Sequence, residues 1–140
     1  MIVAVLDTNV LVSAFPAHNT VPALLIDAWR HGAFHLVVSE HILEELAETW
    51  CDPYWHARIS LTERAEVISL LRSTAIVTAL TVEVSGVATH PEDDLILATA
   101  VAAKATYLVT GDRKLRAVGN FQDVIILSPR EFLTALERAW

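Results

Sequence analysis

The chain has 140 residues, of which 54% are apolar, so it suits one domain with one substantial core. Its formal net charge of −7 argues against a protein held on nucleic acid by a broad basic face, but it allows an acidic metal site or a basic partner. There is no apolar run long enough to span a membrane, no signal-peptide pattern and only one cysteine, so we expect a cytoplasmic protein without membrane contact.

Strands and helices alternate along the chain. The predicted elements, in order, are a buried strand at 2–6, a helix at 20–32, a strand at 34–38, a helix at 40–50, a connector at 51–60, a helix from Ser60 to Ser73, one or two short strands at 75–84, a helix from Pro91 to Lys104, strands at 106–110 and 123–127, and a helix from Ser128 to Ala139. Short apolar strands between helices are typical of a parallel sheet covered on both faces. We predict a single α/β domain over residues 1–140, with three α/β/α layers and a mainly parallel sheet of about five strands.

Acidic residues follow the ends of several predicted strands. Asp7 comes directly after the first strand, Glu45 lies about six residues past the second, and Asp112 comes two residues after the strand that ends at Thr110. The helix before that strand opens with Glu92, Asp93 and Asp94. Ligands of open α/β sheets bind beyond the carboxyl ends of the strands. A single parallel sheet can therefore bring Asp7, Glu45, Asp94 and Asp112 to one edge.

Each acid also has a purely structural interpretation. Asp7 can cap a helix that begins at Thr8, and Asp112 can be a turn residue after Gly111. The acids at 92–94 can complement the dipole of a helix N-terminus, which we favour for Glu92 and Asp93.

Taken together, however, the acids favour a metal site. Carboxylates gathered at one edge repel one another and tend to take up protons, and a divalent cation removes that repulsion. Ligand sets made of oxygen alone suit Mg²⁺ or Mn²⁺, and the chain has no Cys–His cluster typical of zinc.

Four motifs carry a resemblance to a known family: "VLDTNVLVSA" (5–14), Ser39 followed six residues later by Glu45-Leu46, "DDLILATA" (93–100) and "YLVTGD" (107–112). In this order and spacing they resemble the PIN-domain nucleases, and most closely the VapC-like ribonuclease toxins of toxin–antitoxin pairs. The C-terminal "LSPREFL" is similar to a branch of PIN-family toxins.

The resemblance implies a catalytic and metal-binding set of Asp7, Glu45, Asp94 and Asp112. An ungapped count back from Asp112 gives Asp94 as the third acid, and a one-residue gap gives Asp93 instead. Supporting polar residues would be Asn9, Thr110 and Ser39. One or two ions of Mg²⁺ or Mn²⁺ would serve as cofactor.

Substrate contacts are open to two interpretations. Arg113, Lys114 and Arg116 can contact RNA phosphates or form an ordinary exposed loop and short helix. Tyr54 and Trp55 can stack on an unpaired base, or they can pack in the core or an interface, which we favour.

The sequence thus predicts a metal-dependent ribonuclease, the toxin of a toxin–antitoxin pair, with an RNA substrate and a cognate antitoxin. A homodimer is also expected, from the family resemblance and from apolar content that includes four tryptophans, Trp29, Trp50, Trp55 and Trp140. The alternatives are a non-catalytic acidic module that binds metal or a partner, or a nuclease or phosphatase acting on another substrate. Phosphatases of the haloacid-dehalogenase type want a second Asp where this chain has Asn9.

Overall fold

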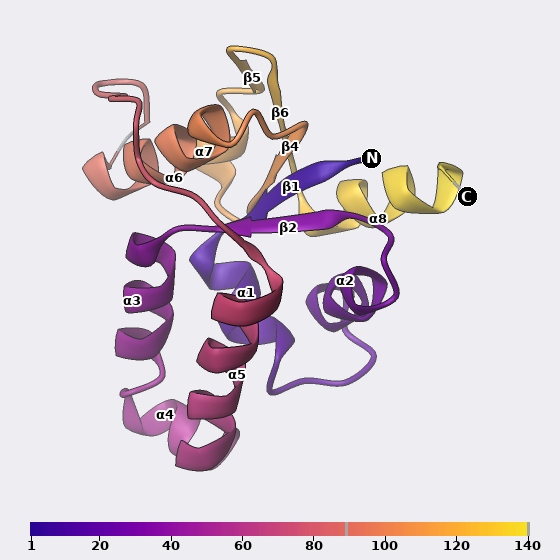
Figure 1. Ribbon diagram of the computed structural model, residues 1–140, viewed down its shortest axis with the longest axis vertical. Helices are drawn as coiled ribbons and strands as arrows, with labels where there is room; N and C mark the ends of the chain where they lie inside the picture. The colour runs from indigo at the N-terminus through magenta and orange to yellow at the C-terminus, as the bar shows by residue number, and fades with distance from the viewer. Residues whose placement is uncertain (89, 140) are drawn as a thin grey trace.

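A six-stranded sheet forms the centre of the molecule (Figure 1). The computed structural model describes residues 1–88 and 90–139. The strands lie in the order β3-β2-β1-β4-β6-β5, and their bounds are β1 Val3–Leu6, β2 His35–Val38, β3 Ile76–Val77, β4 Tyr107–Val109, β5 Asn120–Phe121 and β6 Val124–Leu127. All neighbours pair in parallel except β5, which runs antiparallel to β6. The prediction of a mainly parallel α/β sheet is confirmed.

Strand β1 lies between β2 and β4, and this position matters for the site. Ala4 pairs with Leu36 on one side and with Tyr107 on the other. The chain leaves β1 toward β2 and later returns to the opposite side of β1 as β4. In sheets of this type, the crevice that binds ligands forms beyond the strand ends where the order reverses in this way. Asp7 follows β1 at that point.

The sheet has six strands rather than about five because the predicted strand at 123–127 is one half of a hairpin. The other half, β5, is only two residues long, too short to give an alternating pattern in sequence. Its hairpin turns through Gln122 and Asp123, which both have positive φ angles.

The helices have the bounds α1 Thr8–Ala14, α2 Val21–Arg30, α3 Glu40–Thr49, α4 Pro53–His56, α5 Leu61–Thr74, α6 Pro91–Ala102, α7 Arg113–Arg116 and α8 Pro129–Arg138. Ser60 with Glu63, and Ser128 with Glu131, form the capping boxes that begin α5 and α8. Helix α1 is the helix that the sequence offered with Asp7 as its cap, whereas α4 was not predicted, since it is short and lies within the expected connector.

Helices cover both faces of the sheet. Helix α6 packs on β1 and β4, while α1 packs between α2 and α3 below the strands in Figure 1. Helices α3 and α5 run side by side away from the sheet, and α4 joins their far ends. Among the described residues, none of the helices combines the length and the apolar character needed to cross a bilayer.

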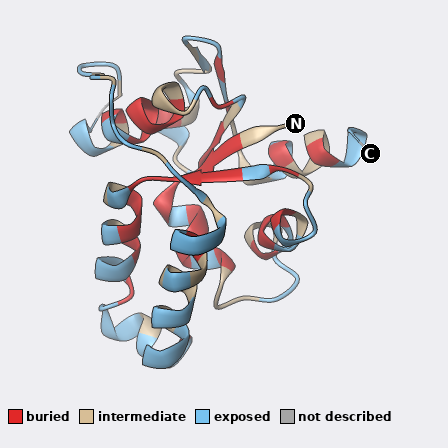
Figure 2. Cartoon of the chain, viewed as in Figure 1, coloured by how far each residue is buried: buried red, intermediate tan, exposed pale blue. Residues whose placement is uncertain are grey.

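The core lies around β1, β2 and β4, whose residues are mostly buried, whereas α5 is largely exposed and buries only Leu71 (Figure 2). Two of the four tryptophans belong to this core: Trp50 is fully buried and Trp29 is 8% exposed. They fill the monomer and give no support to a dimer interface, while Trp140 lies outside the described residues.

Candidate active site

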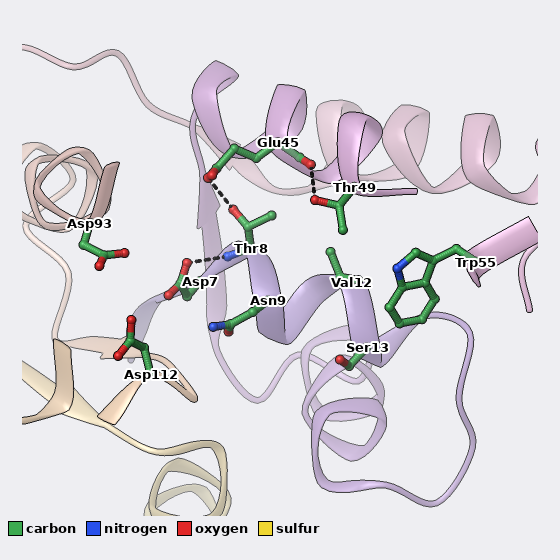
Figure 3. A pocket seen from close by; sticks show the side chains of 10 residues that line it. All are labelled: Asp7, Thr8, Asn9, Val12, Ser13, Glu45, Thr49, Trp55, Asp93 and Asp112. Carbon is green, nitrogen blue, oxygen red and sulfur yellow. Dashed lines mark hydrogen bonds between the residues drawn. The ribbon is translucent and has the colours of Figure 1, made fainter. Parts of the chain in front are cut away.

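A cavity of about 370 Å³ opens at the carboxyl edge of the sheet (Figure 3). Its lining residues are Asp7, Thr8, Asn9, Val12, Ser13, Glu45, Thr49, Trp55, Asp93 and Asp112. The four carboxylates in this set come from four separate segments: the end of β1, the middle of α3, the first turn of α6 and the start of α7. The fold therefore gathers acids from distant parts of the chain, as the sequence predicted for three of them.

Asp7 both caps helix α1 and lines the cavity. It is the N-cap of α1, where its Oδ1 accepts a hydrogen bond of 2.7 Å from the Thr8 backbone N–H. Its Oδ2 accepts a second bond of 2.8 Å from the Thr110 hydroxyl. The carboxyl group is thereby fixed in orientation at the buried end of β1.

Burial raises the pKa of Asp7 to about 6, and the charges of Asp93 and Glu45 add to the increase. The two hydrogen bonds act in the opposite direction but do not cancel it. Asp93 has a raised pKa as well, from burial first and then from the Asp112 carboxylate. The cavity thus holds carboxylates whose negative charges oppose one another.

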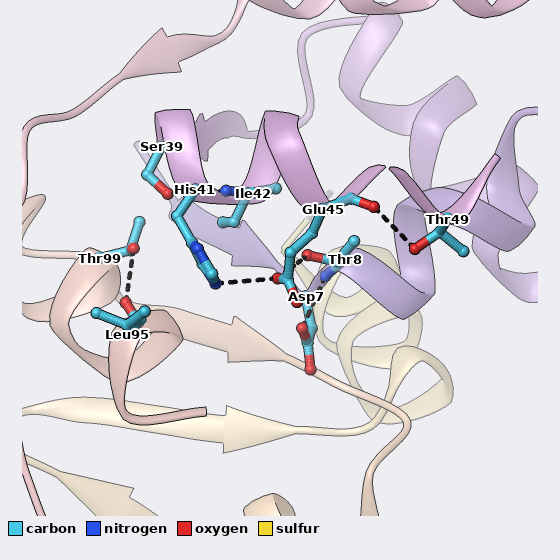
Figure 4. A network of polar contacts seen from close by, with 9 residues as sticks. All are labelled: Asp7, Thr8, Ser39, His41, Ile42, Glu45, Thr49, Leu95 and Thr99. Atoms are coloured by element: carbon cyan, nitrogen blue, oxygen red, sulfur yellow. Dashed lines mark hydrogen bonds and ion pairs between the residues drawn. The ribbon is translucent and has the colours of Figure 1, made fainter. Parts of the chain in front are cut away.

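Glu45 contacts two polar side chains through the same oxygen (Figure 4). Its Oε1 accepts a hydrogen bond of 2.9 Å from the Thr8 hydroxyl and lies 3.2 Å from Nε2 of His41, one helical turn earlier. Sequence reasoning missed both Thr8 and His41. A signal existed for His41, because residues four apart on a helix meet on one face. For Thr8 the signal was weaker, since the contact joins residues 37 positions apart.

Of the two candidates for the third acid, Asp94 and the alternative Asp93, the structure brings Asp93 to the cavity. Asp93 lines the cavity, whereas Asp94 is buried elsewhere and accepts backbone hydrogen bonds of 3.0 Å from Gly86 and 2.7 Å from Ala88. Adjacent helical residues point about 100° apart, so only one of the pair can face the other acids. The backbone N–H groups of the loop at 86–88 bind the Asp94 carboxylate, and the Asp93 side chain points toward Asp112.

Asp112 caps the short helix α7 and accepts from the Lys114 backbone N–H at 2.8 Å. Its own N–H donates to the Thr110 hydroxyl oxygen at 3.0 Å, so Thr110 links Asp7 and Asp112. None of the three basic residues of α7 lines the cavity. Arg113 and Lys114 are exposed beside it, while Arg116 is half-buried and its charge acts on Glu131.

The other predicted supporting residues have different positions. Asn9 lines the cavity but is exposed, and within the described part of the chain it makes no hydrogen bond to an acid. Ser39 is buried and caps α3 by accepting from the Ile42 N–H at 3.2 Å. It contacts none of the acids and acts on Glu45 only through the helix that carries it.

Comparison with known proteins gives two results. A family described as "PIN domain" matches residues 3–114. A chain in the crystal structure of VapBC2 from Rickettsia felis, bound to a DNA fragment from their promoter, matches with a TM-score of 0.60 and 18% identity. That match covers 91% of this chain and 98% of the other, and at this identity it shows a common fold alone. None of the curated proteins matches the sequence.

Proposed function

Because the chain belongs to the PIN domain family, we propose that it is a metal-dependent ribonuclease and the toxin of a toxin–antitoxin pair. The observation that carries the proposal is the meeting of Asp7, Glu45, Asp93 and Asp112 on one cavity at the switch point of the sheet. An acidic cavity of this kind is unsuited to a phosphate ester by itself, since the acids and the ester are both anionic. A cation that neutralises the acids makes the two compatible.

The donor set fits Mg²⁺ or Mn²⁺. All four groups are carboxylates, and the raised pKa values of Asp7 and Asp93 mark a site that favours added positive charge. Over residues 1–88 and 90–139, no three His, Cys, Asp or Glu side chains are grouped closely enough to hold an ion among them. An ion held here would therefore complete its coordination with water molecules, as Mg²⁺ usually does.

The chain's own residues then have distinct tasks. Asp7, Asp93 and Asp112 would hold the ion directly or through water, and Thr110 keeps Asp7 oriented. Glu45, positioned by Thr8 and His41, would be a further ligand or the general base that takes the proton of the attacking water. When bound, the ion supplies charge neutralisation at phosphorus and a more acidic water. Water adds to phosphorus, the phosphorus–oxygen bond to the leaving sugar breaks, and that oxygen gains a proton.

Cleavage of RNA by the purified protein tests the proposal. We expect activity with Mg²⁺ or Mn²⁺, none after chelation by EDTA, and a loss of at least 100-fold in kcat for Asp7→Asn. Hydrolysis of p-nitrophenyl phosphate without RNA cleavage would instead support a phosphatase. Metal binding in calorimetry without turnover of either substrate would support a non-catalytic module.

The partner proposals rest on the family and on the structural likeness. The similar Rickettsia felis structure is VapBC2 on promoter DNA, and we infer a cognate antitoxin for this chain as well. An arginine of that partner would suit the acidic cavity, because a guanidinium can bridge carboxylates. A homodimer and a cytoplasmic location belong to the same proposal.

A further inference from the structure

One wall of the acidic cavity is aromatic. Trp55, from α4, lies across the cavity from Asp93 and Asp112, with Val12 and Ser13 of α1 between them (Figure 3). A metal site does not need an indole in its wall. The indole surface of Trp55 therefore suits a ligand that has an apolar face as well as a charge.

Trp55 differs from the core tryptophans of this chain. Trp50 is fully buried, and its indole N–H donates to the Val12 carbonyl oxygen at 3.3 Å. Trp55 is only half-buried, with part of its surface packed on the core and part on the cavity. Packing in the core explains its orientation but not the surface it presents to the acids.

Two neighbours extend this surface away from the cavity. Tyr54 is 56% exposed, and its ring meets the Trp55 ring edge-on, with ring centroids 4.9 Å apart. The guanidinium of Arg58 lies 3.7 Å from the centroid of the Tyr54 ring. Arg58 is exposed and its Nη1 donates to the Tyr54 carbonyl oxygen. It has no ion pair with any carboxylate in the described ranges, so its positive charge is not neutralised within the chain. We call Tyr54, Trp55 and Arg58 the α4 platform.

We propose that the α4 platform is a binding subsite for one unpaired nucleotide of the RNA substrate, an inference that rests on the proposed ribonuclease function. The base stacks on Trp55, and Arg58 contacts the phosphate of that nucleotide or its neighbour. Every base has a π-face, and stacking on an aromatic side chain is a standard means of holding single strands. Because the acids and Trp55 share one cavity, a phosphate at the acids brings an adjacent nucleotide to the platform.

The same geometry predicts selectivity for unpaired RNA. A base within a duplex is already stacked and paired, so it reaches Trp55 only after leaving the helix. The platform therefore favours loops and single strands over duplexes, with little dependence on which base is present.

Binding measured without cleavage tests the subsite. All variants are made in the inactive Asp7→Asn protein, and fluorescence anisotropy reports Kd for a labelled single-stranded RNA and for the same strand in a duplex. Trp55→Ala should weaken single-strand binding about 10-fold, within the range of one lost base stack, while Trp55→Phe stays within about 3-fold of the parent. Leu61→Ala, which removes another exposed apolar side chain nearby, is the matched control and should change nothing. Melting curves establish that each variant is folded.

A double-mutant cycle identifies the partner of Trp55. An abasic nucleotide is moved along the RNA, and at one position it should weaken binding to the parent while making Trp55→Ala harmless. Arg58→Gln should reduce the salt dependence of binding by about one counterion. The subsite is wrong if folded Trp55→Ala binds single strands as tightly as the parent, or if its loss is the same at every abasic position. Absence of RNA cleavage by the wild-type protein, in contrast, would reject the proposed function itself.

Discussion

Asp7 is subject to opposing effects, and their balance can be measured. Burial and neighbouring carboxylates oppose its ionisation, while Thr110 and the Thr8 N–H favour it. With a pKa of about 6 in the folded state against an ordinary value of 3.8, the folded protein binds this proton more tightly than the unfolded chain. The resulting stabilisation is complete below about pH 4 and is lost as the pH rises through about 6.

The substitution Asp7→Asn removes this charge permanently. In EDTA at pH 8 we expect it to raise the free energy of unfolding, by at most about 3 kcal/mol, since about two pKa units correspond to that energy. The amide oxygen still accepts from the Thr8 N–H, and the amide NH₂ can donate to the Thr110 hydroxyl oxygen, because a hydroxyl can accept as well as donate. Urea unfolding of both proteins from pH 4 to pH 8 measures the difference, which should shrink toward pH 4. A metal-free Asp7→Asn protein that is less stable than wild type at pH 8 would contradict this account.

Asp93 and Asp94 separate function from stability at adjacent positions. Asp93→Asn should abolish cleavage and leave unfolding nearly unchanged, because this side chain faces the cavity. Asp94→Asn should destabilise the protein by about 1–3 kcal/mol, because an amide cannot accept from both Gly86 and Ala88 without turning its NH₂ toward one of them. Activity per folded molecule and urea unfolding distinguish the two effects. The reverse pattern would restore Asp94 as the third acid.

Sequence reasoning reached Asp7, Glu45 and Asp112 because each follows a strand whose apolar run is plain. It could not decide between Asp93 and Asp94, since the deciding contact is a tertiary one to the loop at 86–88. Spacing along a helix fixes the angle between two side chains but not the direction in which either one points.

At the level of elements, α3 is what presents Glu45 to the cavity. Ser39 begins this helix as a buried cap, and a lost cap costs about 1 kcal/mol. We expect Ser39→Ala to lower stability by that amount and to change kcat less than 3-fold, because Thr8 and His41 still hold the Glu45 side chain. Ser39→Thr keeps the hydroxyl and serves as the control. A large loss of kcat in Ser39→Ala with normal stability would mean that Ser39 acts on the site directly.

The elements that the sequence predicted well are helices that begin with a capping box and strands that are uniformly apolar. The capping boxes at Ser60 and Ser128 are local signals, β1 and β6 are continuous apolar runs, and β2 is apolar after His35. The missed elements, α4 and β5, are four and two residues long. Segments so short have no period, and their structure is decided by what they pack against.

The molecule as a whole and its acidic cavity are both negatively charged. A basic inhibitor and a metal ion are therefore both attracted to the cavity, and we expect them to compete for it. Inhibition by the cognate partner should weaken as Mg²⁺ or Mn²⁺ rises, and substitution of the partner's arginines should relieve it. Cleavage assays at several fixed metal concentrations measure this. Inhibition that is indifferent to metal would show that the partner binds away from the acids.

The homodimer is a separate prediction at this scale. The burial of Trp29 and Trp50 removes one argument for it, and the family resemblance remains. Light scattering at micromolar concentration should report twice the mass of the 15.4 kDa chain. A monomer mass under those conditions would reject the dimer without affecting the proposed chemistry.

The central position of β1 also has a consequence for how such a protein is made. Asp7 is synthesised about a hundred residues before its neighbour strand β4 and its partner Thr110, and Asp112 is the last of the four acids to be added. A nascent chain that stops short of Asp112 has an incomplete acidic set, however well its first half has folded. Any chemistry that needs all four acids can therefore begin only after Asp112 has been added and β4 has paired with β1.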